Sequence, residues 1–138
     1  MPTSISAKIP TAILILPLLL LMACASTQEQ MYALDKSFNA YERALRWQEV
    51  DVLVAFHKNE HENLTTEKRK YLKQFRVTSY NVVFSNVEVD GNHANQVIEL
   101  KYYKKDTITI HELTINNKWE YDEKAQRWYL TNNLPDFK

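Results

Sequence analysis

Glycine and cysteine are almost absent from this chain, and each absence excludes a class of protein chemistry. Its 138 residues include one glycine, Gly91, and one cysteine, Cys24. Loops that wrap the phosphates of a nucleotide need several glycines, because the backbone must approach the ligand closely. Nucleotide-binding fingerprints are therefore excluded. A single cysteine also excludes an intramolecular disulfide.

The chain also has no excess of charge of either sign. Seventeen Lys and Arg residues balance 17 Asp and Glu residues, so the formal net charge is zero. Domains that bind nucleic acid are normally strongly basic, and we therefore expect no nucleic-acid partner. With 45% hydrophobic and 25% charged residues, the composition is that of a folded globular chain, and its length has room for one domain.

A hydrophobic run long enough to cross a bilayer is absent as well. Residues 11–22 form a mostly apolar stretch of 12 residues behind the lone positive charge of Lys8. A transmembrane helix needs about 20 such residues. The short stretch therefore predicts the core of an export signal.

The apolar run ends in Leu21-Met22-Ala23-Cys24, which resembles the lipobox of bacterial lipoproteins. The resemblance implies that the Cys24 thiol receives diacylglycerol, that residues 1–23 are cleaved off, and that the new amino terminus is acylated. Two or three acyl chains hold a protein stably on a membrane. Ala25 follows Cys24 and implies delivery to the outer membrane, facing the periplasm. An ordinary secretory signal followed by a chance cysteine is the alternative.

Residues 24–30 are short and polar and predict a tether, extended over at most about 20 Å, before a single domain at 31–138. Leu34, Phe38, Tyr41 and Leu45 recur at the spacing of one helix face. A second apolar stripe predicts a shorter helix over 47–57. A third helix is expected to start at Thr65, whose hydroxyl can cap free backbone N–H groups, and to reach residue 75.

After residue 75 the pattern changes to that of β-strands. Residues 77–89 are rich in β-branched and aromatic types, and Asp90-Gly91-Asn92 is typical of a hairpin turn before a strand at 94–103. Further strands are expected at 107–121 and 127–131. Helices first and strands afterwards predict an α+β fold, with amino-terminal helices packed on a curved, cone-like antiparallel sheet of about four strands.

The third expected strand has an irregular apolar pattern. Ile108 and Ile110 share one parity, whereas Leu113 and Ile115 share the other. A β-bulge near His111 would turn both sets towards the helices and would curl the sheet into a cone with a cavity. An unbroken hydrogen-bond ladder beside an exposed Ile108 would contradict the version with a cavity.

Segments at 44–56, 76–80, 102–103, 119–121, 128–130 and 134–137 together resemble the nuclear-transport-factor-2-like superfamily. The resemblance implies a bent sheet wrapped on helices. Members include isomerases, dehydratases and non-catalytic binding modules, so the fold does not determine the function.

The segment 57–61 matches the H-x-x-E-H pattern of inverted zinc peptidases. On a helix, His57 and His61 would face together and bind Zn²⁺, with Glu60 as general base. The segment falls where the second helix is expected to end, however, and a solvated polar loop is the favoured interpretation. His111 and Glu112 lie on opposite faces of a strand and cannot act as a pair. We therefore expect no metal, no cofactor and no catalytic residue, and an enzyme is the less favoured class.

Four strand aromatics can be interpreted as either pocket or core: Tyr80, Tyr102, Trp119 and Trp128. As a pocket they would suit a small hydrophobic ligand, but core is the commoner role of strand aromatics. Both tryptophans are expected to be at least half buried. The favoured function is a non-catalytic envelope lipoprotein that binds another envelope protein. A ligand-binding cone and a cavity enzyme are the alternatives, and an exposed contiguous apolar patch would favour the first.

Overall fold

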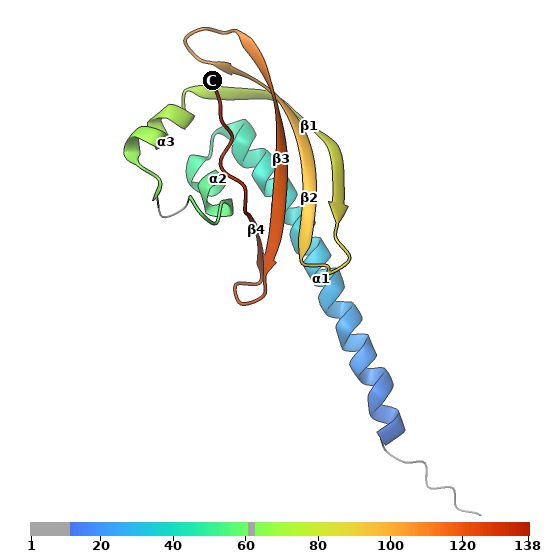
Figure 1. Ribbon diagram of the computed structural model, residues 1–138. Helices are drawn as coiled ribbons and strands as arrows, with labels where there is room; N and C mark the ends of the chain where they lie inside the picture. The colour runs from blue at the N-terminus through green and yellow to red at the C-terminus, as the bar shows by residue number, and fades with distance from the viewer. Residues whose placement is uncertain (1–11, 61–62) are drawn as a thin grey trace, which may run out of the picture.

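Four antiparallel strands lie side by side in chain order, and three helices pack against them (Figure 1). The computed structural model describes residues 12–60 and 63–138, with side chains from residue 26 onwards. The elements are α1 (Ala12–Trp47), α2 (Val50–Phe56), α3 (Thr66–Leu72), β1 (Phe75–Val87), β2 (His93–Lys104), β3 (Ile110–Asp122) and β4 (Arg127–Leu130). The predicted α+β fold class is confirmed.

Helix α1 is longer than the sequence pattern indicated. Leu34, Tyr41 and Leu45 are buried on its inner face, as their spacing predicted. The helix is continuous from Ala12, so residues 24–30, the expected extended tether, are helical and span only about 9 Å. Figure 1 shows its amino-terminal part projecting beyond the rest of the molecule. It ends at Trp47 because Gln48 adopts a positive φ of 57°.

The two short helices follow from local signals. Thr65 caps α3, since its side-chain oxygen accepts a hydrogen bond of 3.1 Å from the Lys68 backbone N–H. Helix α3 ends at Leu72, earlier than expected, because Phe75 already belongs to β1 and is buried there. The β1–β2 hairpin turns at Gly91, whose φ of 74° suits a residue without a side chain.

The expected bulge near His111 is absent, and this prediction was wrong. The β2–β3 ladder is regular from His93↔Glu120 to Tyr103↔Ile110. Ile108 is 73% exposed and Ile110 is 54% exposed, so neither belongs to the core. The prediction assumed that all apolar residues of the strand face inwards. The prediction that a bulge near His111 curls the sheet into a cone with a cavity is therefore contradicted.

The irregular positions lie in β1 instead. Its register against β2 shifts between Val77 and Ser79 and again between Val82 and Phe84. Each shift places one extra residue in β1, which bends the strand and increases its twist. Since β1 is an outer strand of the sheet, this bending affects one edge and leaves the β2–β3 pair regular.

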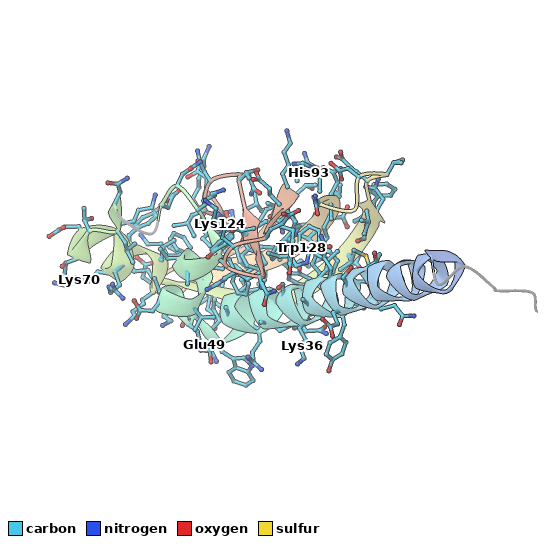
Figure 2. All side chains as sticks on the ribbon, turned by 90° about the horizontal axis from the view of Figure 1, so that it is seen from below. Lys36, Glu49, Lys70, His93, Lys124 and Trp128 are labelled. Atoms are coloured by element: carbon cyan, nitrogen blue, oxygen red, sulfur yellow. The ribbon has the colours of Figure 1, made fainter. Side chains whose placement is uncertain are left out.

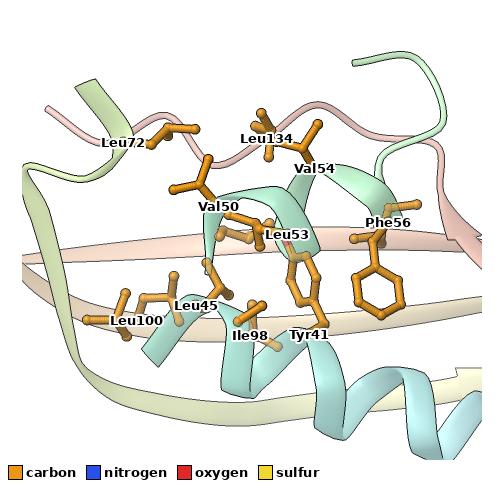
Figure 3. Close-up of a cluster of buried hydrophobic side chains, with 14 of the residues drawn as sticks. Tyr41, Leu45, Val50, Leu53, Val54, Phe56, Leu72, Ile98, Leu100 and Leu134 are labelled. Carbon is orange, nitrogen blue, oxygen red and sulfur yellow. The ribbon is translucent and has the colours of Figure 1, made fainter. Parts of the chain in front are cut away.

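The core lies between the inner faces of α1 and α2 and the sheet (Figure 3). Trp119 is 1% exposed, and its ring meets the rings of Phe38, Tyr41 and Phe56 edge-on at centroid distances of 5.3, 5.7 and 5.7 Å. Trp128 is fully buried. The prediction that both tryptophans are at least half buried is confirmed.

The segment after β4 completes the core. Leu134 and Phe137 are buried, and the Phe137 ring stacks on Phe75 at 5.3 Å. The Tyr71 hydroxyl donates a 2.7 Å hydrogen bond to the Phe137 carbonyl oxygen. Residues 131–138 therefore hold α3 and the start of β1 together.

Candidate functional site

Cys24 lies within α1, in the part whose backbone alone is described. The lipobox residues 21–24 are helical, and lipidation of Cys24 stays a prediction. Within residues 12–60 and 63–138, no helix is both long and apolar enough to cross a membrane.

His57, the first residue of the H-x-x-E-H pattern, is a core residue with both ring nitrogens occupied. Its Nδ1 lies 2.7 Å from the Asn132 carbonyl oxygen and its Nε2 lies 3.1 Å from the Tyr41 hydroxyl. A carbonyl oxygen can only accept, so Nδ1 carries the proton and Nε2 accepts from Tyr41. Both nitrogens have protein partners, and neither is free to bind Zn²⁺.

The rest of the pattern does not assemble as a peptidase site would require. Helix α2 ends at Phe56, and His57 has an extended conformation, so the helical i, i+4 geometry is missing. Glu60 accepts a 3.0 Å hydrogen bond from the Leu134 backbone N–H. His61 lies outside the described residues. The expectation of a solvated loop was wrong for His57, which is completely buried.

Burial is the main cause of the shifted pKa values of His57 and Tyr41. It lowers the pKa of His57 below its usual value, against smaller opposing effects of the Asn132 carbonyl and Glu60. Burial also raises the pKa of the Tyr41 hydroxyl well above its usual value. Both groups are therefore neutral near pH 7.

The lowered pKa of His57 predicts a pH-dependent stability. Below its usual pKa of 6.5 the unfolded chain binds a proton at His57 that the folded protein does not bind. The free energy of unfolding should therefore fall as the pH drops below 6.5, down to the folded pKa, and this effect should vanish above 6.5. Urea denaturation at about pH 7.5 and about pH 5.5 measures it.

The matched control for this titration is His57→Gln, which cannot titrate. His93 is an exposed histidine whose pKa is raised, chiefly by its hydrogen bond to Asp90, so it favours the folded state at low pH and opposes His57. The His57→Gln protein should therefore lose less stability on acidification than the wild type. An equal loss in both proteins would contradict the assignment to His57.

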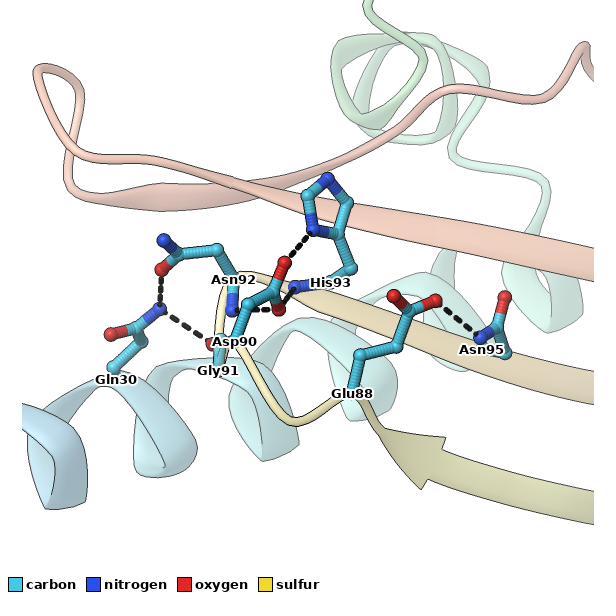
Figure 4. Close-up of polar contacts among 7 residues, drawn as sticks. All are labelled: Gln30, Glu88, Asp90, Gly91, Asn92, His93 and Asn95. Carbon is cyan, nitrogen blue, oxygen red and sulfur yellow. Dashed lines mark hydrogen bonds and ion pairs between the residues drawn. The ribbon is translucent and has the colours of Figure 1, made fainter.

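The β1–β2 turn carries a second polar cluster (Figure 4). Ligand atoms of Glu88, Asp90 and His93 all lie within 4.8 Å of one another, and all three side chains are exposed. His93 Nδ1 lies 2.5 Å from an Asp90 carboxylate oxygen, and Asn95 donates a 3.0 Å hydrogen bond to Glu88. The side chains of Glu88, Asp90 and His93 thus each form a hydrogen bond within the protein.

These contacts stabilise the turn itself. The bond to the His93 ring lowers the pKa of Asp90. The backbone N–H groups of Asn92 and His93 lower it further, since they donate to the other Asp90 oxygen at 2.9 and 3.2 Å. Gln30 of α1 donates to the Gly91 carbonyl and the Asn92 side chain, both at 2.8 Å. The cluster therefore stabilises the turn, and Gly91 and Asn92 fasten the hairpin to α1.

The four strand aromatics are not gathered around one hollow. Tyr102, Trp119 and Trp128 are buried in packed surroundings. Tyr80 borders a groove of about 260 Å³ between α1 and β1, and its hydroxyl donates to Gln96 at 3.4 Å. Burial raises the pKa of Tyr80. In the described residues these positions thus serve mainly as core.

The outer strand β1 carries four exposed apolar residues, Val82, Val83, Phe84 and Val87, and the exposed Val89 follows it in the turn. Val83 and Phe84 are 54% and 52% exposed. No charged residue occurs between Arg76 and Glu88. Natural proteins usually protect such edges with charges or proline, and this edge has only its two register shifts.

Sequence reasoning missed a second exposed surface, the outer face of α1, which we define as Tyr32, Lys36, Asn39, Arg43 and Trp47. Tyr32 is 63% exposed and Trp47 is 66% exposed. Figure 2 shows α1 along one side of the molecule, with Lys36 pointing away from the strands. The signal was present as a repeat of four, three, four and four residues, parallel to the buried stripe but displaced around the helix.

Comparison with known proteins places the fold but not the function. No family model matches the chain, and no curated protein matches its sequence. The fold is similar to a SEC-C motif containing protein from Rhodopseudomonas palustris (11% identity over 66% of this chain and 69% of that one, TM-score 0.54). It is also similar to a sec-c motif containing protein from Psychrobacter arcticus (11% identity, 69% of this chain, TM-score 0.52), of whose length the chain spans 56%.

At this identity the likeness concerns the fold alone. The resemblance to the nuclear-transport-factor-2-like superfamily is not tested by these two structures and stays a prediction. The chain shares the fold of the matched parts of two bacterial proteins that contain a SEC-C motif.

Proposed function

We propose that this chain is a lipid-anchored envelope protein, held through Cys24 at the outer membrane and facing the periplasm, whose domain is a non-catalytic interaction module. The lipobox resemblance supports the anchor. The exposed apolar edge of β1 supports the interaction role and is the observation that carries it.

The edge suits a partner that contributes an extended segment. Its backbone N–H and C=O groups on the side away from β2 have no strand beside them in the described part of the chain. Val83 and Phe84 stand there without a charged neighbour in β1. A strand from another envelope protein would pair with this backbone and cover these side chains, the mode of recognition called β-augmentation.

Replacing the anchor residue tests the first part of the proposal. The Cys24→Ser protein should incorporate no lipid, because a hydroxyl does not replace the thiol that receives diacylglycerol. Labelled fatty acid fed to growing cells measures this directly. Met22→Leu, a change at the tolerant position of the same lipobox, is the matched control and should stay labelled. Label on the Cys24→Ser protein would contradict the anchor.

A photo-crosslinking residue tests the second part. At Phe84 it should yield a discrete product with another envelope protein in intact cells, because this side chain stands on the open edge. Ile110 is equally exposed, at 54% against 52%, but lies on β3, and serves as the control position. Absence of a product from Phe84, or the same product from Ile110, would contradict β1 as the contact edge.

A further inference from the structure

We infer that the outer face of α1 lies on the anionic surface of the bilayer that holds the lipid anchor, so that the domain rests on its side along this helix. The inference rests on the proposed anchoring at Cys24 and adds to it a protein surface and an orientation.

The composition of the face is that of a helix at a membrane interface. With about 100° per residue, Arg43 lies on the line opposite the buried stripe of Leu34, Tyr41 and Leu45. Tyr32 and Lys36 lie within about 20° of this line, and Asn39 and Trp47 within about 40°. Tyrosine and tryptophan rings favour the headgroup level of a bilayer, and lysine and arginine are attracted by anionic lipids.

The two cations of the face are available for such contacts. Neither Lys36 nor Arg43 forms an ion pair with a described residue. The Lys36 ammonium lies 4.6 Å from the centre of the Tyr32 ring, so that cation and aromatic ring already share one surface. Of the acidic residues of α1, Asp35 and Glu42 lie about 80° and 100° from the line opposite the buried stripe, and Glu42 is paired with Arg46 at 2.8 Å. The exposed Glu29 lies about 40° from this line, one carboxylate against the two cations.

The face is continuous with the anchor and cannot rotate away from it. Helix α1 runs without a break from Cys24 through Trp47, a rise of about 35 Å. Its opposite side is fixed to the sheet by the buried Tyr41 and by Gln30, whose carbonyl oxygen accepts from the Trp128 indole at 3.0 Å. A helix that begins at the lipid and lies in the interface therefore presents this one face to it.

The competing orientation would stand the domain upright on its β1–β2 and β3–β4 turns. These turns carry the exposed carboxylates of Glu88, Asp90 and Glu123 against one exposed cation, Lys124, within residues 88–92 and 123–126. Anionic headgroups repel these carboxylates, whereas they attract the cations on the outer face of α1. Charge complementarity therefore favours the lying orientation.

Trp47 serves as a built-in probe, because Trp119 and Trp128 are 1% and 0% exposed and report only on the core. The mature lipidated protein is inserted in vesicles of phosphatidylcholine and phosphatidylglycerol at about 3:1, with and without bromine on the acyl chains. Subtracting the emission of a Trp47→Phe protein isolates Trp47. We expect brominated lipid to reduce the Trp47 emission at least about twofold and the bound emission to shift to shorter wavelength.

Two charge-matched variants identify the surface. Lys36→Gln with Arg43→Gln removes two cations from the outer face of α1, and Lys70→Gln with Lys73→Gln removes two exposed cations from α3 and its carboxyl-terminal cap. The first variant should lose the quenching of Trp47 while it still floats with the vesicles. The second should be quenched like the wild type. Equal loss in both variants would mean a general charge effect and would overturn the inference.

Flotation separates failure of the inference from failure of the anchor. If the wild type floats with vesicles but Trp47 is not quenched, the anchor stands and the lying orientation is overturned. If the wild type carries no lipid and does not float, both proposals fall. If Trp47 is shielded from aqueous quencher in detergent without lipid and light scattering shows a dimer, a second copy covers the face and the inference is overturned.

Discussion

Trp119→Ala should lower the free energy of unfolding by about 3–5 kcal/mol, the usual range when a buried tryptophan is truncated to alanine. The ring is 1% exposed and has edge contacts with Phe38, Tyr41 and Phe56. Its removal leaves a cavity between α1, α2 and β3 that these rings cannot fill without moving. Denaturation in urea measures the loss.

Trp119→Phe is the informative control. The Trp119 indole N–H is buried and has no hydrogen-bond partner among the described residues. Phenylalanine therefore loses no hydrogen bond and removes an unsatisfied donor, which offsets part of the smaller cavity it leaves. We expect a loss of no more than about 1 kcal/mol. A loss below about 1 kcal/mol for Trp119→Ala itself would contradict the central place of this ring in the core.

Trp128→Ala should also destabilise the protein by about 3–5 kcal/mol, since the side chain is fully buried. Here the indole N–H does have a partner, because it donates a 3.0 Å hydrogen bond to the Gln30 carbonyl oxygen of α1. The substitution therefore removes both core volume and the bond between β4 and the amino-terminal part of the domain.

Replacement by phenylalanine removes a hydrogen bond at Trp128 but not at Trp119. Trp128→Phe should cost about 1–3 kcal/mol more than Trp119→Phe, because it leaves the Gln30 carbonyl without its donor. Hydrogen exchange in α1 around Gln30 should accelerate in Trp128→Phe and not in Trp119→Phe. If the two phenylalanine variants unfold at the same urea concentration, the bond to Gln30 contributes no measurable stability.

The elements of this fold were predictable where one physical signal dominated. The stripe through Leu34, Tyr41 and Leu45 predicted the buried side of α1, and all three are buried. Asp90 and Gly91 predicted the hairpin turn, because both residue types suit its backbone. These signals are local, so the sequence alone carries them.

The wrong predictions concern residues whose burial or exposure depends on tertiary contacts. Ile108 and Ile110 were assigned to the interior by their hydrophobicity, but they lie at the exposed end of the β2–β3 hairpin. His57 was assigned to solvent by its polarity, whereas Tyr41 and Asn132 satisfy both of its nitrogens inside the core. Partners 16 and 75 residues away in the chain cannot be identified from a single sequence.

The exposed edge of β1 and the outer face of α1 also depend on tertiary structure that the sequence alone does not give. The β1 segment was recognised as a strand, but its position at the edge of the sheet, which exposes Val83 and Phe84, depends on the strand order. Tyr32 and Trp47 are aromatic residues that a hydrophobicity pattern would assign to a core. The packing of α1 on the sheet shows that they face outwards, on the side that the displaced repeat of this helix indicated.

The long sequence separation of the core contacts affects the rate at which the domain folds. The bond between Trp128 and Gln30 joins residues 98 positions apart, and that between Tyr71 and Phe137 joins residues 66 apart. Domains dominated by such distant contacts fold slowly. Helix α1 packs on α2 and β1, but the Trp119 ring and the Trp128 bond that close the core on its inner face come from β3 and β4. A chain exported as we propose would therefore still be unfolded while it is threaded across the inner membrane, and Cys24 would receive its lipid before the domain closes.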